Sequence, residues 1–521
     1  MSELGNDALM KTFGAKKRYS PDNYSGRPLV TKVAFATVVI VTSLSTSVVA
    51  QAFTSQERAT AVPGIASHRW SLQQVSTISC PTSGNCSAGG TYSYGSGIPR
   101  SNYFKGAFVV NELHGIWQNA IELRGIGAYA VIDSVSCSSA GNCGAVGTDV
   151  RGVFVLNEVG GVWGSEKRIE KLSPSADTQW KQFIACPTTA NCSVAGNDPT
   201  ISGSPEGTFV ANEINGKWSS AILLPGLPVR THLNFDQSQL TSISCASPGD
   251  CSVGGNYTVG PLGIQTPFVD GEVNGKWGRA IEVPGTQVSD SNVVASVNSV
   301  ACTSIGNCVA GGITTSHVDS NNGVAFVVNE VHGRWGAAAI VPNTPTPKGN
   351  GVNGNYPPSM GQVDVISCQS FGNCSAGGIY SAEQSASKSS GGVFMVSETN
   401  GSWQHAVLFP AISTYDSPVL TALSCSSVGN CIGGAIFSID KSGIYFRARL
   451  IHEKNGKWDA PTAIAGTDNP LGTSWDRSEV LAVSCDRSGF CGEGGDFRND
   501  VPAADPLYQG APTIGFVANV D

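Results

Sequence analysis

Residues 299–312 read SVACTSIGNCVAGG, and residues 324–342 of the same repeat read VAFVVNEVHGRWGAAAIVP. This two-part unit occurs eight times in the chain, with first cysteines 49 to 66 residues apart. A period of this length indicates a repeat architecture. Every cysteine belongs to a C-x5-C pair, one pair in each repeat: Cys80 with Cys86, Cys137 with Cys143, Cys186 with Cys192, Cys245 with Cys251, Cys302 with Cys308, Cys368 with Cys374, Cys425 with Cys431 and Cys485 with Cys491.

Each unit predicts four short antiparallel strands. Its apolar runs are rich in Val, Ile, Phe and Trp and are bounded by Gly, Asn and Pro, which is typical of strands. Asn274-Gly275 and its counterparts separate the third run from the fourth, and Asn-Gly favours a type I′ hairpin. Directly opposed residues of such a pair lie about 4.5 to 5.5 Å apart at Cα, so we expect a disulfide across the first hairpin.

Four strands per unit predict a β-propeller of about eight blades. The last repeat stops at its third strand, and residues 58–64 match the fourth-strand residues 279–285 of repeat four. We therefore expect an N-terminal strand to complete the last blade and close a single domain over 53–521. An open solenoid is the alternative, and two smaller rings are another, because residues 342–361 have the composition of a linker.

The N-terminus predicts export. Basic residues precede an uncharged segment, 33–50, and Ala50-Gln51-Ala52 resembles a cleavage site, which would leave Phe53 as the mature start. Residues 1–52 are thus a signal peptide or, since 33–50 approaches membrane-spanning length, a membrane anchor. Paired cysteines persist in oxidising compartments, so we expect a secreted or cell-surface location.

Neither a metal nor a cofactor is expected. A C-x5-C pair offers two thiols and no His at a fixed position, whereas zinc takes four ligands. The net charge of −8 and the lack of a basic stripe along the sequence argue against nucleic acid and anionic membranes as partners of the repeats. Membrane contact is expected only through an uncleaved N-terminal segment, and the protein is expected to be a monomer.

Repeated polar and aromatic residues are interpreted as structural. The Trp after each hairpin turn fits a wedge between blades better than a sugar platform. The repeated Glu, such as Glu158 and Glu213, is expected to bond turn amides or a nearby Lys or Arg. The serines before the first cysteines, such as Ser79, have no accompanying His or Asp, so a nucleophile with a catalytic triad is not expected.

The cysteine hairpin and the Asn-Gly hairpin lie at the same end of each repeat and are short and nearly uniform, so that end is expected to be structural. Function is expected on the loops at the opposite end, which vary most between repeats. Variable loops on a rigid scaffold are where binding and catalysis concentrate. No catalytic residue can be named. The candidate binding residues are Tyr92, Tyr94, Arg100, Tyr103, His317, Arg498, Asp500 and Tyr508.

The phrases SxSCxSxGNCxAGG and FVVNExNGxWxxAIxVPG resemble a repeat of uncharacterised secreted bacterial proteins, over roughly residues 55–521. The resemblance implies a propeller-like surface or secreted protein and no particular activity. The Gly-x-Trp turn is loosely similar to the Asp-box turn of sialidases, but the Asp and Ser/Thr pattern of that box is missing.

Two functions remain open. The first is a non-enzymatic extracellular or cell-surface binding protein for a glycan, a cell-wall component or another protein. The alternative is a secreted hydrolase or lyase with one site at the channel mouth on the variable-loop face, which would need convergent acid and base residues. A structural envelope protein without a small ligand is a third possibility.

Overall fold

The computed structural model describes fifteen stretches of the chain: 58–65, 72–94, 104–172, 180–198, 207–228, 237–259, 264–286, 295–315, 323–345, 360–385, 388–411, 418–438, 446–467, 477–498 and 513–520. The chain divides into two compact units, Met1–Phe53 and Thr54–Asp521. The predicted leader 1–52 lies outside the described residues. Within the described part, no helix has the length and apolarity needed to cross a membrane.

The described residues of the second unit are all-β, as predicted. Every repeat begins with an inner strand whose last residues include or adjoin the first cysteine: β2 (Leu72–Thr82), β7 (Val131–Ser139), β12 (Phe183–Thr188), β17 (Gln237–Ser247), β22 (Ser296–Ser304), β27 (Met360–Ser370), β32 (Val419–Ser427) and β37 (Ser478–Cys485). The second strands carry the second cysteine: β3 (Asn85–Tyr94), β8 (Asn142–Asp149), β13 (Asn191–Asp198), β18 (Asp250–Val259), β23 (Asn307–Thr315), β28 (Asn373–Ser385), β33 (Asn430–Ser438) and β38 (Cys491–Arg498).

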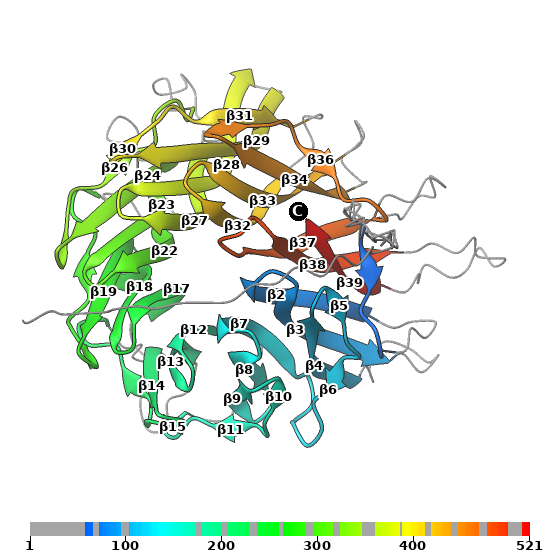
Figure 1. The fold of residues 1–521 in the computed structure, drawn as a ribbon. Helices are drawn as coiled ribbons and strands as arrows, with labels where there is room; N and C mark the ends of the chain where they lie inside the picture. Colours follow the sequence, from blue (N-terminus) through cyan, green and yellow to red (C-terminus); the bar gives the residue numbers. More distant parts are fainter. Residues whose placement is uncertain are drawn as a thin grey trace, which may run out of the picture. The chain divides into compact units, whose positions relative to one another are not determined.

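The third strands carry the Phe-Val-x-Asn-Glu pattern or its variants: β4 (Phe104–Leu113), β9 (Gly152–Val159), β14 (Gly207–Ile214), β19 (Ile264–Val273), β24 (Gly323–Val331), β29 (Lys388–Thr399), β34 (Phe446–Lys454) and β39 (Thr513–Val520). Each of these strands pairs antiparallel with its neighbours in the repeat, for example β17 with β18 and β18 with β19. Figure 1 shows the repeats following one another in chain order, with the inner strands side by side.

The outer strand differs from the single strand that we predicted, because it is split into two short pieces that both pair with the third strand. The first pieces end at the repeated Trp: β5 (Ile116–Trp117), β10 (Val162–Trp163), β15 (Lys217–Trp218), β20 (Lys276–Trp277), β25 (Arg334–Trp335), β30 (Ser402–Trp403) and β35 (Lys457–Trp458). The second pieces are β6 (Ile121–Glu122), β11 (Lys167–Arg168), β16 (Ile222–Leu223), β21 (Ile281–Glu282), β26 (Ala339–Ile340), β31 (Val407–Pro410) and β36 (Thr462–Ala463).

The described strands form six hydrogen-bonded sheets rather than eight. The difference arises at two places, where a single parallel bridge joins neighbouring repeats. Thr513 of β39 pairs with Leu72 of β2, and Gly323 of β24 pairs with Met360 of β27. Four repeats therefore stand as separate five-stranded sheets, and the other four are joined in two pairs.

Strand β1 (Thr60–Ala61) pairs antiparallel with β39 of the last repeat. Thr60 lies opposite Val517 just as Ile281 of β21 lies opposite Val269 in repeat four. The amide of Ala59 donates to Ala465 O at 2.7 Å, toward the preceding repeat. The amide of Ala120 in the first repeat donates to Pro63 O at 2.8 Å. Residues 59–63 thus occupy an outer-strand position between the seventh and the first repeats.

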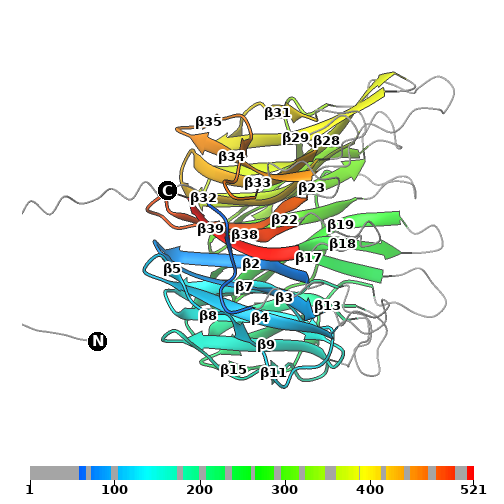
Figure 2. The same ribbon diagram turned by 90° about the vertical axis from the view of Figure 1, so that its right-hand side faces the viewer.

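The cysteine loop and the turn after the third strand lie against each other at one end of every repeat that has both. Figure 2 places β5 and β35, which follow such turns, at the same side of the sheets. The amide of Gly333, in the turn after β24, donates to Gly306 O in the cysteine loop at 2.8 Å, and Gly456 bonds to Gly429 in the same way. A Cβ on Gly306 would lie 2.6 Å from the Gly333 nitrogen, so glycine is favoured there, although repeat three has Ala190 at the equivalent position. Asn274 and Gly275 have φ of 52° and 77°, as the predicted type I′ turn requires.

All eight predicted disulfides are present, and the protein has no free cysteine. The bonds join Cys80 to Cys86, Cys137 to Cys143, Cys186 to Cys192, Cys245 to Cys251, Cys302 to Cys308, Cys368 to Cys374, Cys425 to Cys431 and Cys485 to Cys491. Their geometry differs in one respect from our expectation, because the paired Cα atoms lie only 3.9 to 4.1 Å apart, closer than in the average antiparallel pair.

The two cysteines of a pair also differ in burial, which the symmetric spacing did not predict. The second cysteine is buried in every repeat: Cys86, Cys143, Cys192, Cys251, Cys308, Cys374, Cys431 and Cys491. The first is only half-buried in five repeats, at Cys137, Cys245, Cys302, Cys368 and Cys485. The second cysteine therefore belongs to the core as well as to the disulfide.

The core lies between repeats rather than within them. Phe108 and Val110 of repeat one, for example, share an apolar cluster with Ala482 and Val517 of repeat eight. Each repeat thus buries its apolar residues against its neighbours, as a stacked repeat architecture requires.

Candidate functional site

The serines that precede the first cysteines join neighbouring inner strands. The amide of Cys137 donates to Ser79 Oγ of the preceding repeat at 3.0 Å, and the amide of Cys80 donates to Ser484 Oγ at 2.9 Å. The same bond recurs at four further positions, with Ser136, Ser244, Ser367 and Ser424 as acceptors. These hydroxyls bind backbone amides, which supports the structural interpretation over repeated nucleophiles.

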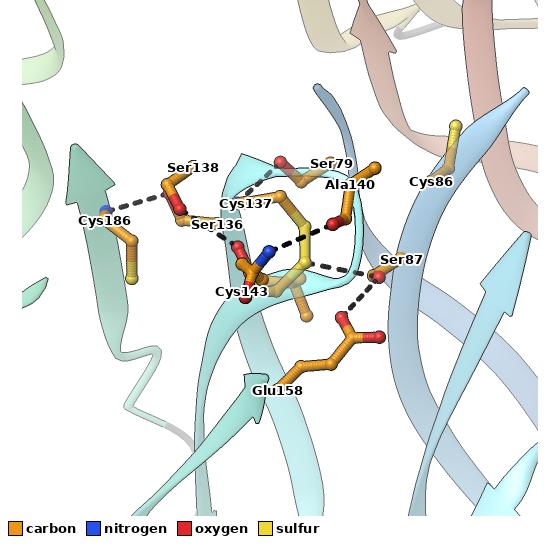
Figure 3. The surroundings of a disulfide bond; sticks show 12 residues. Ser79, Cys86, Ser87, Ser136, Cys137, Ser138, Ala140, Cys143, Glu158 and Cys186 are labelled. Atoms are coloured by element: carbon orange, nitrogen blue, oxygen red, sulfur yellow. Dashed lines mark hydrogen bonds between the residues drawn. A yellow bond between two sulfur atoms is a disulfide. The ribbon is translucent and has the colours of Figure 1, made fainter. Parts of the chain in front are cut away.

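The repeated Glu forms a second set of contacts between repeats, and its partner differs from our expectation. Asn111 Nδ2 donates to Glu158 Oε1 of the next repeat. Ser87 Oγ donates to Glu158 Oε2 at 3.0 Å, as Figure 3 shows. Asn329 donates to Glu398 at 2.7 Å in the same way. The corresponding donors elsewhere are Asn157, Asn212 and Asn519, which bond Glu213, Glu272 and Glu112.

These glutamates are buried and have amide and hydroxyl donors rather than the predicted turn amides or cations. Burial raises the pKa of each of them, and the hydrogen bonds lower it in part: Glu112, Glu158, Glu213, Glu272, Glu330, Glu398 and Glu453. At the junction of repeats one and two, Trp163 Nε1 donates to Asn111 Oδ1 at 2.9 Å, whereas the indole nitrogens of Trp117, Trp218, Trp277 and Trp403 are buried without a hydrogen-bond partner. The predicted role of Trp between repeats is confirmed at this junction.

The junction between repeats six and seven departs from this pattern. Ser397 replaces the Asn, and its hydroxyl lies 3.0 Å from Trp458 Nε1 and 2.5 Å from Glu453 Oε1. A groove of about 680 Å³ opens here, and Gln404, His405 and Lys457 are among its lining residues. The groove lies at the cysteine-loop end of the repeats, the end that we expected to be purely structural.

A second cavity, of about 610 Å³, lies against five consecutive inner strands, and we call it the inner-strand cavity. Its lining combines amide, hydroxyl, aromatic and charged groups: Trp180, Lys181, Phe183, Asn197, Gln239, Leu240, Thr241, Ser242, Asn298, Ser299, Asp364, Val365 and Thr421. Lys181 and Gln239 are exposed, and Trp180 is half-buried.

Several of the lining residues share one position, four residues before the first cysteine, where the inner strand contains a β-bulge. The pairing register shifts there in seven repeats, at Ser76, Asp133, Thr241, Asn298, Asp364, Thr421 and Leu481. Thr241 Oγ1 donates to Val297 O of the next repeat at 2.6 Å, and Asn298 Nδ2 donates to Val363 O at 2.8 Å. A bulge re-aims a side chain, and here it aims a donor at the neighbouring repeat.

Aspartates occupy this bulge position in two repeats. Burial raises the pKa of Asp364 to about 7 and that of Asp133 to about 8, although Lys181 lowers the latter in part. Gln362 Nε2 donates to Asp364 Oδ1 at 2.5 Å, and Asp364 Oδ2 is buried without a hydrogen-bond partner. Asp364 is therefore a carboxyl that can hold a proton near neutral pH at the wall of the inner-strand cavity.

Two of the predicted binding residues, Tyr92 and Arg498, meet in a third cavity of about 230 Å³ between repeats eight and one. Asp496 lines it too and accepts a bond from Gln74 Nε2 at 2.9 Å. Burial and the neighbouring Glu122 raise the pKa of Tyr92. Tyr92 packs against the core shared by repeats eight and one, so part of its side chain serves the fold.

The other predicted binding residues cannot be placed in a site. Tyr94 belongs to β3, and its side chain lies outside the described part of the structure. Five more fall outside the described residues altogether: Arg100, Tyr103, His317, Asp500 and Tyr508. In the described part of the chain, no group of three or more His, Cys, Asp or Glu is arranged to hold a metal ion.

Sequence reasoning missed the bulge residues of the inner-strand cavity. A signal was present, because Val75-Ser76-Thr77-Ile78 and Val297-Asn298-Ser299-Val300 place two polar residues between apolar ones and so break the alternation of a regular strand. The groove between repeats six and seven was signalled by Ser397, which stands where most repeats have Asn. Comparing the repeats position by position for exceptions, rather than for shared residues, would have found both.

Comparisons with known proteins reveal no matching family model and no matching curated protein. Among solved structures, the chain is similar to YCF48 from Cyanidioschyzon merolae at 13% identity and a TM-score of 0.35, over 75% of this chain and 95% of that one. It is similar to a polysaccharide lyase of family PL25, an ulvan lyase, at 9% identity and a TM-score of 0.43, over 78% of this chain and 96% of that one. It is also similar to the β-propeller domain of the trilobed protease from Pyrococcus furiosus, at 8% identity and a TM-score of 0.38, over 77% of this chain and 100% of that one. None of their activities is carried over to this chain.

Proposed function

We propose that this chain is a non-enzymatic binding protein that acts outside the cytoplasm, built as a closed eight-bladed β-propeller. Two observations support closure. Each inner strand contacts the next, including β37 with β2, and β1 pairs with β39. The eight disulfides support an oxidising compartment, since such bonds are rare where thiols are kept reduced.

The observation that carries the proposed binding role is the composition of the inner-strand cavity. Its volume of about 610 Å³ lies in the usual range of small-molecule sites. Among the described residues that line it, Asp364 is the one carboxylate and Lys181 the one amine. Hydrolysis of a glycosidic bond usually needs two carboxyl groups that face each other across the bond. The lining thus favours recognition over chemistry.

The ligand class that fits this lining best is a polyhydroxylated one, such as a glycan or a cell-wall saccharide. Sugar rings present apolar C–H faces that stack on an indole, and hydroxyls that exchange hydrogen bonds with amide and charged side chains. Trp180 supplies an aromatic surface, and Gln239, Lys181 and Asp364 supply hydrogen-bonding groups. A protein ligand that inserts a polar loop is the other class that a binding protein of this kind would take.

The test is a binding screen of the purified full chain against an array of glycans and cell-wall fragments. We expect at least one ligand whose binding is lost in W180A and K181A and kept in H405A, because His405 lines the other groove. If binding survived in W180A and K181A, the ligand would bind outside the inner-strand cavity. No binding at all, together with turnover of a polysaccharide or ester panel, would reject the proposal.

One observation favours the alternative of a hydrolase or lyase. Asp364 has its pKa raised to about 7 by burial, so it could donate a proton at neutral pH. Turnover of a panel substrate by the wild type, abolished in D364N while binding persists, would establish this alternative.

A further inference from the structure

The cysteine-loop end of the repeats gathers cations that lie far apart in the sequence. Exposed Lys and Arg side chains flank the hairpin turns after the third strands: Lys217, Lys276, Arg334 and Lys457 directly precede the repeated Trp, and Lys454 directly follows the repeated Glu. No Asp or Glu lies between the repeated Glu and the repeated Trp in any of these turns. These turns are therefore basic, although Asp250 and Asp486 lie in cysteine loops at the same end, Asp459 follows Trp458, and the chain as a whole carries a net charge of −8.

Large apolar side chains project from the same end in three consecutive repeats. Ile305, Phe371 and Val428 occupy the third position after the first cysteine, and they are 57%, 48% and 52% exposed. Single exposed apolar residues are common on protein surfaces. These three stand in a row at one loop position, where the other repeats place Ser83, Ala140, Thr189, Pro248 and Ser488.

The apolar tips and the cations belong to rigid structural units. In repeat five, the loop that carries Ile305 is hydrogen-bonded to the turn that precedes Arg334, through Gly333 N and Gly306 O at 2.8 Å. In repeat seven, the loop that carries Val428 is bonded in the same way to the turn between Lys454 and Lys457, through Gly456 N and Gly429 O at 2.8 Å. Each disulfide fixes the base of its loop. Little conformational entropy is lost when such a surface binds.

We propose that this basic and apolar face, made of Ile305, Phe371, Val428, Arg334, Lys454 and Lys457, docks on an anionic lipid bilayer. The cations complement lipid phosphates, and the three apolar tips enter the boundary between headgroups and acyl chains. The acidic remainder of the molecule is repelled by the same surface, which orients this face toward it.

A soluble polyanion fits the face less well. Nucleic acid or an anionic polysaccharide would engage the Lys and Arg side chains, but it would leave Ile305, Phe371 and Val428 exposed to water. The bilayer makes use of both sets of side chains. The groove between repeats six and seven opens beside Val428 and Lys457, both of which line it, so a lipid headgroup has a place to enter.

The experiment is co-sedimentation of the full chain with vesicles of phosphatidylcholine alone or with about 30% phosphatidylglycerol, at low and high salt. The readout is the extra binding that the anionic lipid confers, compared between each variant and the wild type, because the basic N-terminal segment contributes equally to both. One variant removes the cations (R334S/K454T/K457S) and another removes the apolar tips (I305S/F371S/V428S). Every replacement copies the residue at the equivalent position of another repeat: Ser402, Thr399 or Ser83.

We expect each variant to lower the anionic increment about tenfold or more, and high salt to weaken wild-type binding. The control R124S/K171N also removes exposed cations, at positions outside this face, and should bind as the wild type does. Unchanged thermal midpoints would establish that the variants are folded. An unchanged increment in either variant would overturn the proposal. If only the cation variant lost binding and short double-stranded DNA competed with the vesicles, the partner would be a soluble polyanion instead.

Discussion

Asp364 stands at a position where Thr241, Asn298 and Thr421 donate a hydrogen bond to a carbonyl of the next repeat. An ionised carboxylate cannot donate, so Asp364 can make the equivalent bond only when protonated, while donors from Gln362 and the Ile379 backbone lower its pKa in part. The folded-state pKa of about 7 lies above the usual value of 3.8. The stability contributed by protonated Asp364 is therefore fully present below about pH 4 and is lost as the pH rises through about 7.

We predict that D364N stabilises the fold at pH 8 by on the order of 1 to 3 kcal/mol, because the amide restores a donor that is neutral at every pH. The gain should shrink as the pH falls toward 4. Thermal unfolding of both proteins from pH 4 to pH 8 measures it. The matched control is N298D, which should introduce the same loss of stability at high pH into repeat five. A lower stability of D364N at pH 8 would contradict this account of the bulge.

The contacts between Asn and Glu make a second prediction at the level of single residues. Asn111 donates to Glu158 and accepts from Trp163 Nε1, so N111A removes the partner of Trp163 Nε1 and of Glu158 Oε1, while Ser87 still donates to Glu158 Oε2. We expect a loss of about 1 to 3 kcal/mol in the free energy of unfolding, measured by chemical denaturation.

The reverse change is available in repeat four, where Gly271 stands in place of the Asn. A Cβ added there would lie 3.8 Å from Ser252 Oγ and 3.9 Å from Glu330 Oε1, so a side chain has room. G271N should gain stability by donating to Glu330. If N111A and G271N changed the free energy of unfolding in the same direction, the Asn–Glu contact would not be what stabilises the junction.

At the scale of the element, the disulfide and the paired turns fix one end of each repeat. Removing one disulfide with C137A/C143A should cost about 2 kcal/mol, because the bond closes a short loop and the chain-entropy gain is small. The thermal midpoint measures this cost. Loss of the fold altogether would mean that the disulfide supports more than its own hairpin.

The sequence sufficed to predict the strands, the turn types and all eight disulfides, because local spacing determines them. The Asn-Gly turns need positive φ, and a five-residue loop places the cysteines opposite each other. Local spacing could not reveal that the outer strand is split, since Trp163 and Arg168 pair with β9 separately. It could not reveal the partner of Glu158 either, because Asn111 lies 47 residues away and becomes its neighbour only when repeats pack.

The same reason explains why the basic and apolar face could not be predicted. Its cations are one in repeat five, none in repeat six and two in repeat seven, so no stripe is visible along the chain, and packing brings these turns to one end. Of the predicted binding residues, Tyr92 and Arg498 came together in a cavity, whereas the inner-strand cavity draws on exceptions to the repeat. Shared residues predict the scaffold, and exceptions such as Asp364 and Ser397 mark the candidate sites.

At the scale of the whole molecule, β1 is joined to β39 without the hairpin that tethers other outer strands. Val62 N donates to Gly515 O, and Val283 N makes the equivalent bond to Pro267 O, each at 3.0 Å. V62P and V283P remove the same bond from the same context. V62P should lower the thermal midpoint further, because release of β1 separates segments that no short loop holds together. Equal falls in the thermal midpoint for V62P and V283P would mean that β1 contributes no more to stability than another outer strand does.

Closure of the propeller by residues 58–65 is the central claim, and hydrogen exchange on the unmodified chain tests it most directly. Ala59 N and Val62 N bond to Ala465 O and Gly515 O, as Ala280 N and Val283 N bond to Pro225 O and Pro267 O in repeat four. We predict that peptides covering 58–65 exchange as slowly as those covering 279–286. Exchange of 58–65 at the rate of an unstructured peptide, with 279–286 protected, would contradict the closed ring.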